Sequence, residues 1–155
     1  MSNKIIKVYA DTSVFGGVFD SEFSEASQLF FDLVRNNKFT LAISPVVEAE
    51  ITKAPRKIQD LFREMLIFAK QIPVTQEVID LQQSYIAERI LTNKWIDDAL
   101  HVALATVGNC DVIVSWNFKH IVNYKKIPLF NAVNILNGYE KLDIYSPLEI
   151  VNDED

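Results

Sequence analysis

Short apolar segments with the character of β-strands alternate along this chain with longer segments of helical periodicity. Segments 4–10 (KIIKVYA), 39–43 (FTLAI) and 111–115 (DVIVS) are short and rich in β-branched residues, which is typical of strands buried inside a sheet. We also predict a short edge strand at 72–74 and a further strand at 127–130. Strands that alternate with helices favour an α/β fold, in which helices cover both faces of a parallel sheet.

Helices are predicted between these strands, and two of them have clear ends. Ser44 is followed by Pro45, a pair that combines a preferred N-cap with a proline at the first helical position. The helix that begins there contains Glu48 and Glu50. Another apolar stripe of helical spacing ends at Gly108-Asn109. The predicted helices cover residues 24–36, 45 onwards, 56–70, 75–89 and 96–107.

The length of 155 residues suits one domain, which we predict at 1–150, followed by an acidic tail at 151–155. The single cysteine, Cys110, excludes an internal disulfide framework and fits a reducing compartment. The first residues contain too short an apolar run, and too early a charge at Asp11, for a signal peptide. No stretch approaches the roughly 20 apolar residues of a membrane span. We therefore expect a soluble, cytoplasmic protein with no membrane partner.

The net charge of −6 argues mildly against nucleic acid as a partner, because phosphate binding normally requires a basic field. However, Asp153, Glu154 and Asp155 account for three of these charges. Basic residues are also clustered locally, at 53–57 and at 119–126. An enzyme that binds its substrate briefly needs less basic surface than a stoichiometric binder. The charge therefore lowers the expectation of a nucleic-acid substrate without excluding it.

Polar side chains follow the predicted strands at the positions where ligands bind in open parallel sheets. Asp11-Thr12-Ser13 comes after the first strand, and Ser115-Trp116-Asn117 follows the 111–115 strand. Glu50 lies in the helix after the second strand, and Asp97-Asp98 opens a helix whose other face is apolar. Clustered carboxylates repel one another unless a cation neutralises them. Ligand sets made only of oxygen favour Mg²⁺ or Mn²⁺ over zinc.

Four segments, in this order, resemble the acidic motifs of PIN-domain ribonucleases, whose most abundant members are the VapC-type toxins of bacterial toxin–antitoxin pairs. The segments are VYADTSVF, SPVVEAEI, WIDDALHVALA and DVIVSWNFKHI, and the resemblance spans about residues 4 to 147. It implies a PIN-like three-layer α/β/α sandwich with a central parallel sheet of four or five strands. It also implies cleavage of RNA with Mg²⁺ or Mn²⁺, a homodimer, and an antitoxin protein as partner.

The resemblance identifies Asp11 as the first acid and Asp98 as the third. Glu50 is the second acid, because the family pattern is an acid followed by an aliphatic residue. Glu48 cannot face the same site, since two residues along a helix turn a side chain by roughly 200°. Asn117 stands where many members have a fourth acid. The amide oxygen can still bind a metal, but three negative charges put a two-metal mechanism in doubt.

In the implied reaction, a metal held by Asp11 and Asp98, with help from Glu50 and Asn117, activates a water molecule that attacks the scissile phosphate in line. Ser115 matches the hydroxyl residue of the fourth motif. Further supporting positions are Thr12, Ser13 and Asp97, and the candidates for phosphate contact are Lys53, Arg56, Lys57 and Lys119.

Each of these signals also has a purely structural interpretation. Asp11 is suited to capping a short helix directly after it, and Asn117 is a good helix cap as well. His101 lies one turn from the acids of its helix, and a hydrogen-bonded histidine is expected there more often than a metal ligand. We expect Trp95 and Trp116 to pack rather than to stack on bases.

A second function remains open beside the ribonuclease, namely a binding or regulatory module of the same fold whose site is weak because Asn117 replaces the fourth acid. Other carboxylate–metal enzymes fit less well. A phosphotransferase of the haloacid-dehalogenase kind requires a second aspartate where Ser13 stands, and a receiver domain requires its acid pair directly after the first strand. The sequence therefore favours the ribonuclease and, after it, the binding module.

Overall fold

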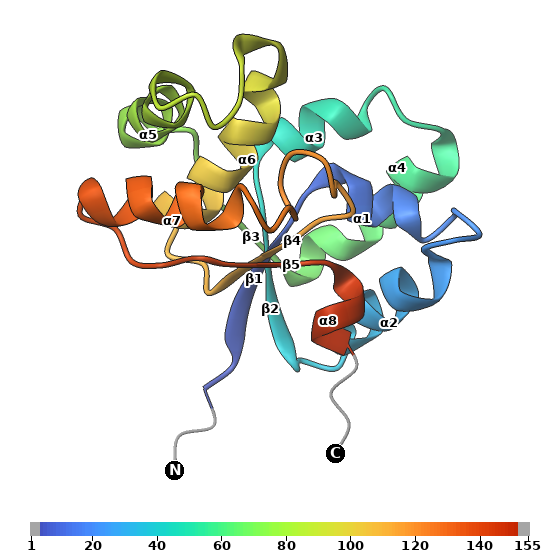
Figure 1. Cartoon of the computed structure of the whole chain (residues 1–155). Coiled ribbons are helices and arrows are strands. Elements are labelled where there is room, and N and C mark those ends of the chain that lie inside the picture. The colour runs from blue at the N-terminus through green and yellow to red at the C-terminus, as the bar shows by residue number, and fades with distance from the viewer. Residues whose placement is uncertain (1–3, 152–155) are drawn as a thin grey trace.

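A parallel sheet of five strands lies at the centre of the computed structural model, which describes residues 4–151 (Figure 1). The strands are β1 (Ile6–Ala10), β2 (Phe39–Ile43), β3 (Ala69–Gln71), β4 (Val112–Val114) and β5 (Asp143–Tyr145). Their order in the sheet is β3-β2-β1-β4-β5, and every neighbouring pair is parallel. Val8 of β1 pairs with Leu41 of β2 and with Val112 of β4. The carboxyl ends of all five strands therefore meet at one edge.

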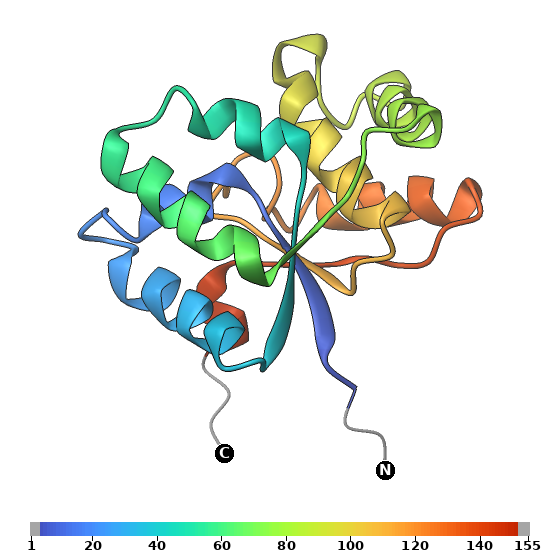
Figure 2. The same cartoon turned by 180° about the vertical axis from the view of Figure 1, so that it is seen from behind.

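Helices connect the strands and form a layer on each face of the sheet. They are α1 (Thr12–Gly17), α2 (Ser24–Arg35), α3 (Pro45–Ile51), α4 (Arg56–Met65), α5 (Gln76–Ala87), α6 (Ile96–Val107), α7 (Ile127–Leu136) and α8 (Pro147–Val151), with short 3₁₀ segments η1 (Leu66–Phe68) and η2 (Asn93–Trp95). Figures 1 and 2 show α5, α6 and α7 on one side of the sheet and α1, α2, α4 and α8 on the other. The predicted α/β class with three layers is confirmed.

The inner strands β1 and β4 are buried because helices cover both of their faces. Val8, Tyr9 and Ala10 of β1 are fully buried, as are Ile113 and Val114 of β4. Strands that are apolar throughout their length, rather than on alternate residues, are expected in such a sheet. The core therefore fixes the ends of β1 and β4, and with them the polar residues that follow.

Several predicted elements are confirmed almost to the residue. The bounds of β2 are those predicted, and α2 differs from the predicted helix by one residue at its end. Ser44 caps α3, since its Oγ accepts the backbone N–H of Val47 at 3.3 Å. Thr75 caps α5 in the same way through the N–H of Val78. The hydroxyl caps therefore place these helix starts correctly.

The predicted strand at 127–130 is wrong, because residues 127–136 form the helix α7. Pro128 lies in its first turn, where a missing backbone N–H breaks no helical bond. Asn131 ties the buried side of this helix to the chain before β5, donating to the carbonyl of Leu142 at 2.9 Å and accepting its N–H at 2.7 Å. The remaining strand is β5, which the sequence pattern does not predict.

The predicted helix at 56–70 is too long, and the predicted edge strand at 72–74 begins too late. The helix α4 ends at Met65, and the edge strand β3 occupies residues 69–71. Lys70, which follows the helical pattern, instead pairs with β2 in the parallel ladder. Pairing with a neighbouring strand thus overrides a local helical period.

The predicted acidic tail begins at Val151, which is still the last residue of α8. Residues 152–155 of that tail lie outside the described residues. Within the described range 4–151, no helix combines the length and the apolar character needed to cross a membrane.

Gly17 lies in close contact with α2 and with the segment that follows β4. A Cβ atom here would lie 2.5 Å from Ser27 Oγ and 2.6 Å from Trp116 Nε1. These two atoms form a buried hydrogen bond of 2.8 Å. We expect Gly17→Ala to lower the free energy of unfolding by about 1–3 kcal/mol, as overpacking of a core does. Urea-induced unfolding followed by circular dichroism measures this change.

Gly16→Ala is the matched control in the same helix. A Cβ atom at that position meets Ile58 Cδ1 at an ordinary 3.8 Å. This variant should keep the stability of the parent or gain up to about 1 kcal/mol, because alanine favours the helix. An equal loss of stability in both variants would contradict the packing argument.

Candidate active site

Asp11 stands at the carboxyl edge of the sheet, where β1 turns directly into α1. Its carboxylate caps that helix, since Oδ1 accepts the backbone N–H of Ser13 at 3.1 Å and the hydroxyl of the same residue at 2.6 Å. The other oxygen, Oδ2, accepts the hydroxyl of Ser115 at 2.7 Å from the end of β4. The capping role expected of Asp11 is therefore confirmed, and it fixes the buried carboxylate between two strand ends.

Burial raises the pKa of Asp11, because a carboxylate loses its hydration inside the protein. The positive charge of His101 and the hydrogen bonds from Ser13 and Ser115 act in the opposite direction but do not cancel this effect. A bound divalent cation would favour the ionised form.

Glu50 projects from α3 toward the same edge of the sheet. Its Oε1 accepts a hydrogen bond from the hydroxyl of Thr12 and lies 3.0 Å from Nε2 of His101. Burial alone would raise the pKa of Glu50, but the hydrogen bond and charge of His101, together with Thr12 and the charge of Lys53, lower it below its ordinary value. Glu50 is therefore held as a carboxylate beside Asp11's helix.

His101 is the buried centre of this cluster, on the inner face of α6. Its Nδ1 lies 2.8 Å from the hydroxyl of Tyr9, and that hydroxyl lies 2.8 Å from Ser44 Oγ. Burial opposes a positive charge on the imidazole of His101. The hydrogen bond to Glu50 and the charges of the neighbouring carboxylates outweigh burial and raise the pKa of His101. These carboxylates belong to Asp11, Glu50 and Asp98. The imidazole of His101 therefore contacts Glu50 and lies close enough to Asp11 and Asp98 for their charges to affect its pKa.

Asp98 lies in the first turn of α6, and its carboxylate has a second imidazole as partner. Its Oδ2 lies 3.0 Å from Nδ1 of His120. Asp98 and Glu50 line the same open pocket, of about 550 Å³. The other residues that line this pocket are Lys94, Trp95, Asp97, Asn117, Lys119 and His120. Asp97, as its exposed position indicates, stands at the outer side of the site.

Asn117 uses its side-chain oxygen to close a turn after β4. Oδ1 accepts the backbone N–H of Lys119 at 3.2 Å and that of His120 at 2.9 Å. The capping interpretation of Asn117 therefore describes its contacts, although residues 118–122 form turns rather than a helix. The residue still lines the pocket with Glu50 and Asp98.

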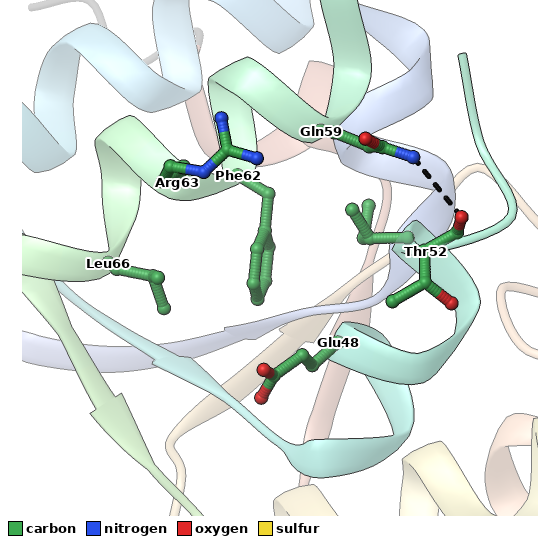
Figure 3. A pocket seen from close by; sticks show the side chains of 7 residues that line it. Glu48, Thr52, Gln59, Phe62, Arg63 and Leu66 are labelled. Atoms are coloured by element: carbon green, nitrogen blue, oxygen red, sulfur yellow. Dashed lines mark hydrogen bonds between the residues drawn. The ribbon is translucent and has the colours of Figure 1, made fainter. Parts of the chain in front are cut away.

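Glu48 points away from the site, as the helical geometry predicts. Figure 3 shows its side chain in a separate pocket between α3 and α4, opposite Phe62 and Leu66. That pocket has a volume of about 320 Å³ and contains none of the three predicted acids. The two glutamates of α3 thus face different cavities, and only Glu50 contacts the cluster around His101.

The basic residues predicted to contact phosphate are divided by the structure. Lys119 lines the pocket with the acids, and Lys53 lines an adjoining pocket with Glu50. Arg56 instead pairs with Asp60 on its own helix at 3.7 Å, and Lys57 lies over the ring of Phe19. A further basic residue, Lys94, lines the acidic pocket. Lys94 is not predicted from the sequence, because this residue belongs to no cluster of basic residues.

The donor set suits a hard cation in its chemistry, since the predicted ligands are carboxylate and amide oxygens. Their present geometry is not that of a coordination shell. Within residues 4–151, no three His, Cys, Asp or Glu side chains lie close enough together to hold a metal ion. Metal binding would therefore require these side chains to move closer together.

No family model and no curated protein matches this sequence, but solved structures match its fold. One is a crystal structure of VapBC2 from Rickettsia felis bound to a DNA fragment from its promoter, with a TM-score of 0.58 and 18% identity over 90% of this chain and 98% of that chain. Another is a toxin–antitoxin complex from Klebsiella pneumoniae, with a TM-score of 0.56 and 17% identity over 73% of this chain and 88% of that chain. The chain has a PIN-like fold.

The PIN-like fold agrees with the resemblance of the four sequence motifs, and the sheet has the larger of the two predicted strand numbers. Identities of 17% and 18% limit this likeness to the fold itself. The chemistry of the site must therefore be argued from its own residues.

The raised pKa of His101 predicts how stability depends on pH. Protonation favours the folded state, so the stabilisation is complete below the unfolded histidine pKa, roughly 6.5, and is lost as the pH rises through the folded pKa. We expect His101→Gln to lower the free energy of unfolding by about 1.5–3 kcal/mol at pH 6, the range for charged hydrogen bonds. The difference in the free energy of unfolding between the parent and His101→Gln should become smaller at alkaline pH.

Denaturant unfolding of the parent and of His101→Gln at a series of pH values, without divalent cations, tests this. A difference in stability that is the same at acidic and alkaline pH would contradict a charged His101, because only the charged ring gives the difference a pH dependence.

Proposed function

We propose that this chain is a Mg²⁺- or Mn²⁺-dependent endoribonuclease with Asp11, Glu50 and Asp98 as its catalytic acids. The observation that supports this most strongly is their convergence. At the carboxyl edge of the parallel sheet, Glu50 contacts the buried imidazole of His101 and the hydroxyl of Thr12, the residue directly after Asp11, and it lines one pocket with Asp98. Ligand sites of open parallel sheets are found at that edge. The PIN-like fold and the four ordered motifs agree with the proposal.

A divalent cation in this site would acidify a water molecule and offset negative charge on the phosphate. Asp11 and Asp98 would hold it, with Glu50 and Asn117 assisting. His101 keeps Glu50 ionised and directs it toward Thr12, while Tyr9 fixes the orientation of the imidazole. Partners of this kind orient metal ligands in many proteins. Lys119, at the pocket, is placed to attract the phosphate backbone.

The two glutamates of α3 provide a matched test of this assignment. Glu50→Gln should lower the rate of RNA cleavage by about 100-fold or more, the effect of losing one group that acts on charge in the transition state. Glu48→Gln, the same change on the opposite side of the helix, should leave the rate within about twofold, since exposed sites away from the chemistry have small effects. The rate of cleavage of a panel of labelled RNAs, in Mg²⁺ and in Mn²⁺, is measured for both variants.

Asp98→Asn should lose activity like Glu50→Gln. Equal cleavage by every preparation would identify a contaminating nuclease. No cleavage by the folded parent in either metal would contradict the proposal and favour the binding module.

The binding module is the second candidate, and the contacts of Asn117 favour it. An oxygen that already accepts two backbone N–H groups adds no charge to the site. The carboxylates of Asp11, Glu50 and Asp98, each with a protein partner, would then serve to bind a partner molecule rather than to catalyse a reaction. The two candidates differ in metal affinity, because only the nuclease needs a cation that binds at cellular concentrations.

Asn117→Asp tests how far charge limits this site. Aspartate caps a turn as well as asparagine does, so the local fold should be retained. A fourth carboxylate should raise the affinity for Mn²⁺ by roughly threefold to tenfold, because ligand charge sets the affinity of such sites. Titration calorimetry measures the affinity for Mn²⁺, with Glu48→Gln as the control. An unchanged affinity would mean that position 117 lies outside the coordination sphere.

We further propose that the chain acts as the toxin of a toxin–antitoxin pair and forms a homodimer. The two similar structures are toxin–antitoxin complexes, which supports the role as a toxin. The homodimer rests on the resemblance of the four sequence motifs alone. A small adjoining gene whose product binds this chain and suppresses its nuclease activity is the expected partner. Light scattering of the pure chain tests for the homodimer. Light scattering of the co-expressed pair tests for the complex with the antitoxin.

A further inference from the structure

Trp95 differs from Trp116 in its surroundings. Trp116 is buried, stacks on Phe23 at 4.1 Å between ring centroids, and donates its indole N–H to Ser27. Trp95, the last residue of η2, is only partly buried and lines the pocket that contains Asp98. Both tryptophans pack, as expected, since Trp95 also lies against the hydrophobic core. Part of Trp95, however, faces the pocket.

Two lysine side chains lie over the indole of Trp95. The ammonium of Lys94 is 5.1 Å from the ring centroid, and that of Lys119 is 5.7 Å away. The imidazole of His120, the partner of Asp98, lies against the same indole at 4.2 Å between centroids. This arrangement joins an aromatic surface, two cations and a candidate catalytic acid within one pocket.

Neither lysine pairs with a carboxylate in the part of the chain that the structure describes. Acidic groups are near, since Asp97 and Asp98 line the same pocket. The ammonium groups are held instead by the π-face of Trp95, and such contacts are weak at exposed sites. A phosphate competes well with them, because a charged partner attracts an ammonium more strongly than a ring does.

We propose that Trp95, Lys94 and Lys119 form a platform for one unpaired nucleotide next to the catalytic acids. The base stacks on the indole, and the lysines leave the ring to contact the phosphates on either side of that nucleotide. This inference rests on the proposed nuclease function and adds the form of its substrate. The pocket volume of about 550 Å³ lies within the range of small-ligand sites.

The platform selects single strands for a physical reason. Bases inside a duplex already stack on their neighbours and offer no free face to an aromatic side chain. Stacking on a protein aromatic tolerates any base, since every base has a π-face. The platform therefore explains a preference for unpaired substrate without predicting a preferred sequence.

Binding without cleavage tests the platform directly. The parent protein, in EDTA, is titrated with a fluorescein-labelled 12-nucleotide single-stranded RNA and with the same strand in a duplex. Fluorescence anisotropy reports binding, and tryptophan emission reports stacking. We expect tighter binding of the single strand, with quenching of tryptophan emission that disappears in Trp95→Leu.

Four variants and one control give the magnitudes. Trp95→Leu should weaken single-strand binding by about 5- to 150-fold, the range for one stacked base, whereas Trp95→Phe should retain most of it. Lys94→Ala and Lys119→Ala should each reduce the slope of log affinity against log salt by about 0.7. Lys38→Ala is the control, because Lys38 is exposed and precedes β2 at the opposite edge of the sheet.

The outcomes separate this inference from the proposed function. RNA cleavage that depends on Asp98, with single-strand binding unchanged in Trp95→Leu, would overturn the platform and leave the nuclease intact. Trp95-dependent binding without any cleavage in Mg²⁺ or Mn²⁺ would overturn the nuclease instead. Equal loss of affinity in Trp95→Leu and Trp95→Phe, with unchanged thermal unfolding, would also overturn stacking as the cause.

Discussion

The hydrogen bonds of His101 join the sheet to the helices that hold the candidate acids. The imidazole projects from α6, meets Tyr9 at the end of β1 through one nitrogen, and meets Glu50 of α3 through the other. Tyr9 also contacts Ser44, which caps α3. One buried ring therefore fixes the helix that contains Glu50 relative to the strand that precedes Asp11. The hydrogen bond from Thr12 to Glu50 and the contact of Tyr9 with Ser44 link the same two regions a second time.

Electrostatic cost shapes the rest of the site. Carboxylates at one edge of a sheet repel each other, and burial raises the cost of each negative charge. Hydroxyl donors compensate Asp11, and imidazole groups compensate Glu50 and Asp98. Every buried side-chain nitrogen and oxygen among residues 4–151 has a hydrogen-bond partner. The buried part of the site is therefore satisfied by protein groups alone.

Local sequence patterns are sufficient to place Asp11 and Glu50, because each follows a strand or a cap that adjacent residues define. The imidazole partners are not predictable in this way, since they lie 51 residues from Glu50 and 22 residues from Asp98 and no spacing rule connects them. The apolar run at 127–130 fits a buried helix as well as a strand, and periodicity alone does not separate the two. The strand β5 has three residues, too few for any alternation to be recognised.

The position of β1 between β2 and β4 also determines when the site is completed during synthesis. Asp11 is made early, but the hydroxyl that binds its Oδ2 belongs to Ser115, 104 residues later. The pairing of β1 with β4 is equally remote in sequence, and contacts of such long range form late. A nascent chain that has not reached β4 therefore contains Asp11, Glu50 and Asp98 without the strand that closes the site around them. Closure of the site around Asp11 thus requires the chain to be synthesised at least through Ser115.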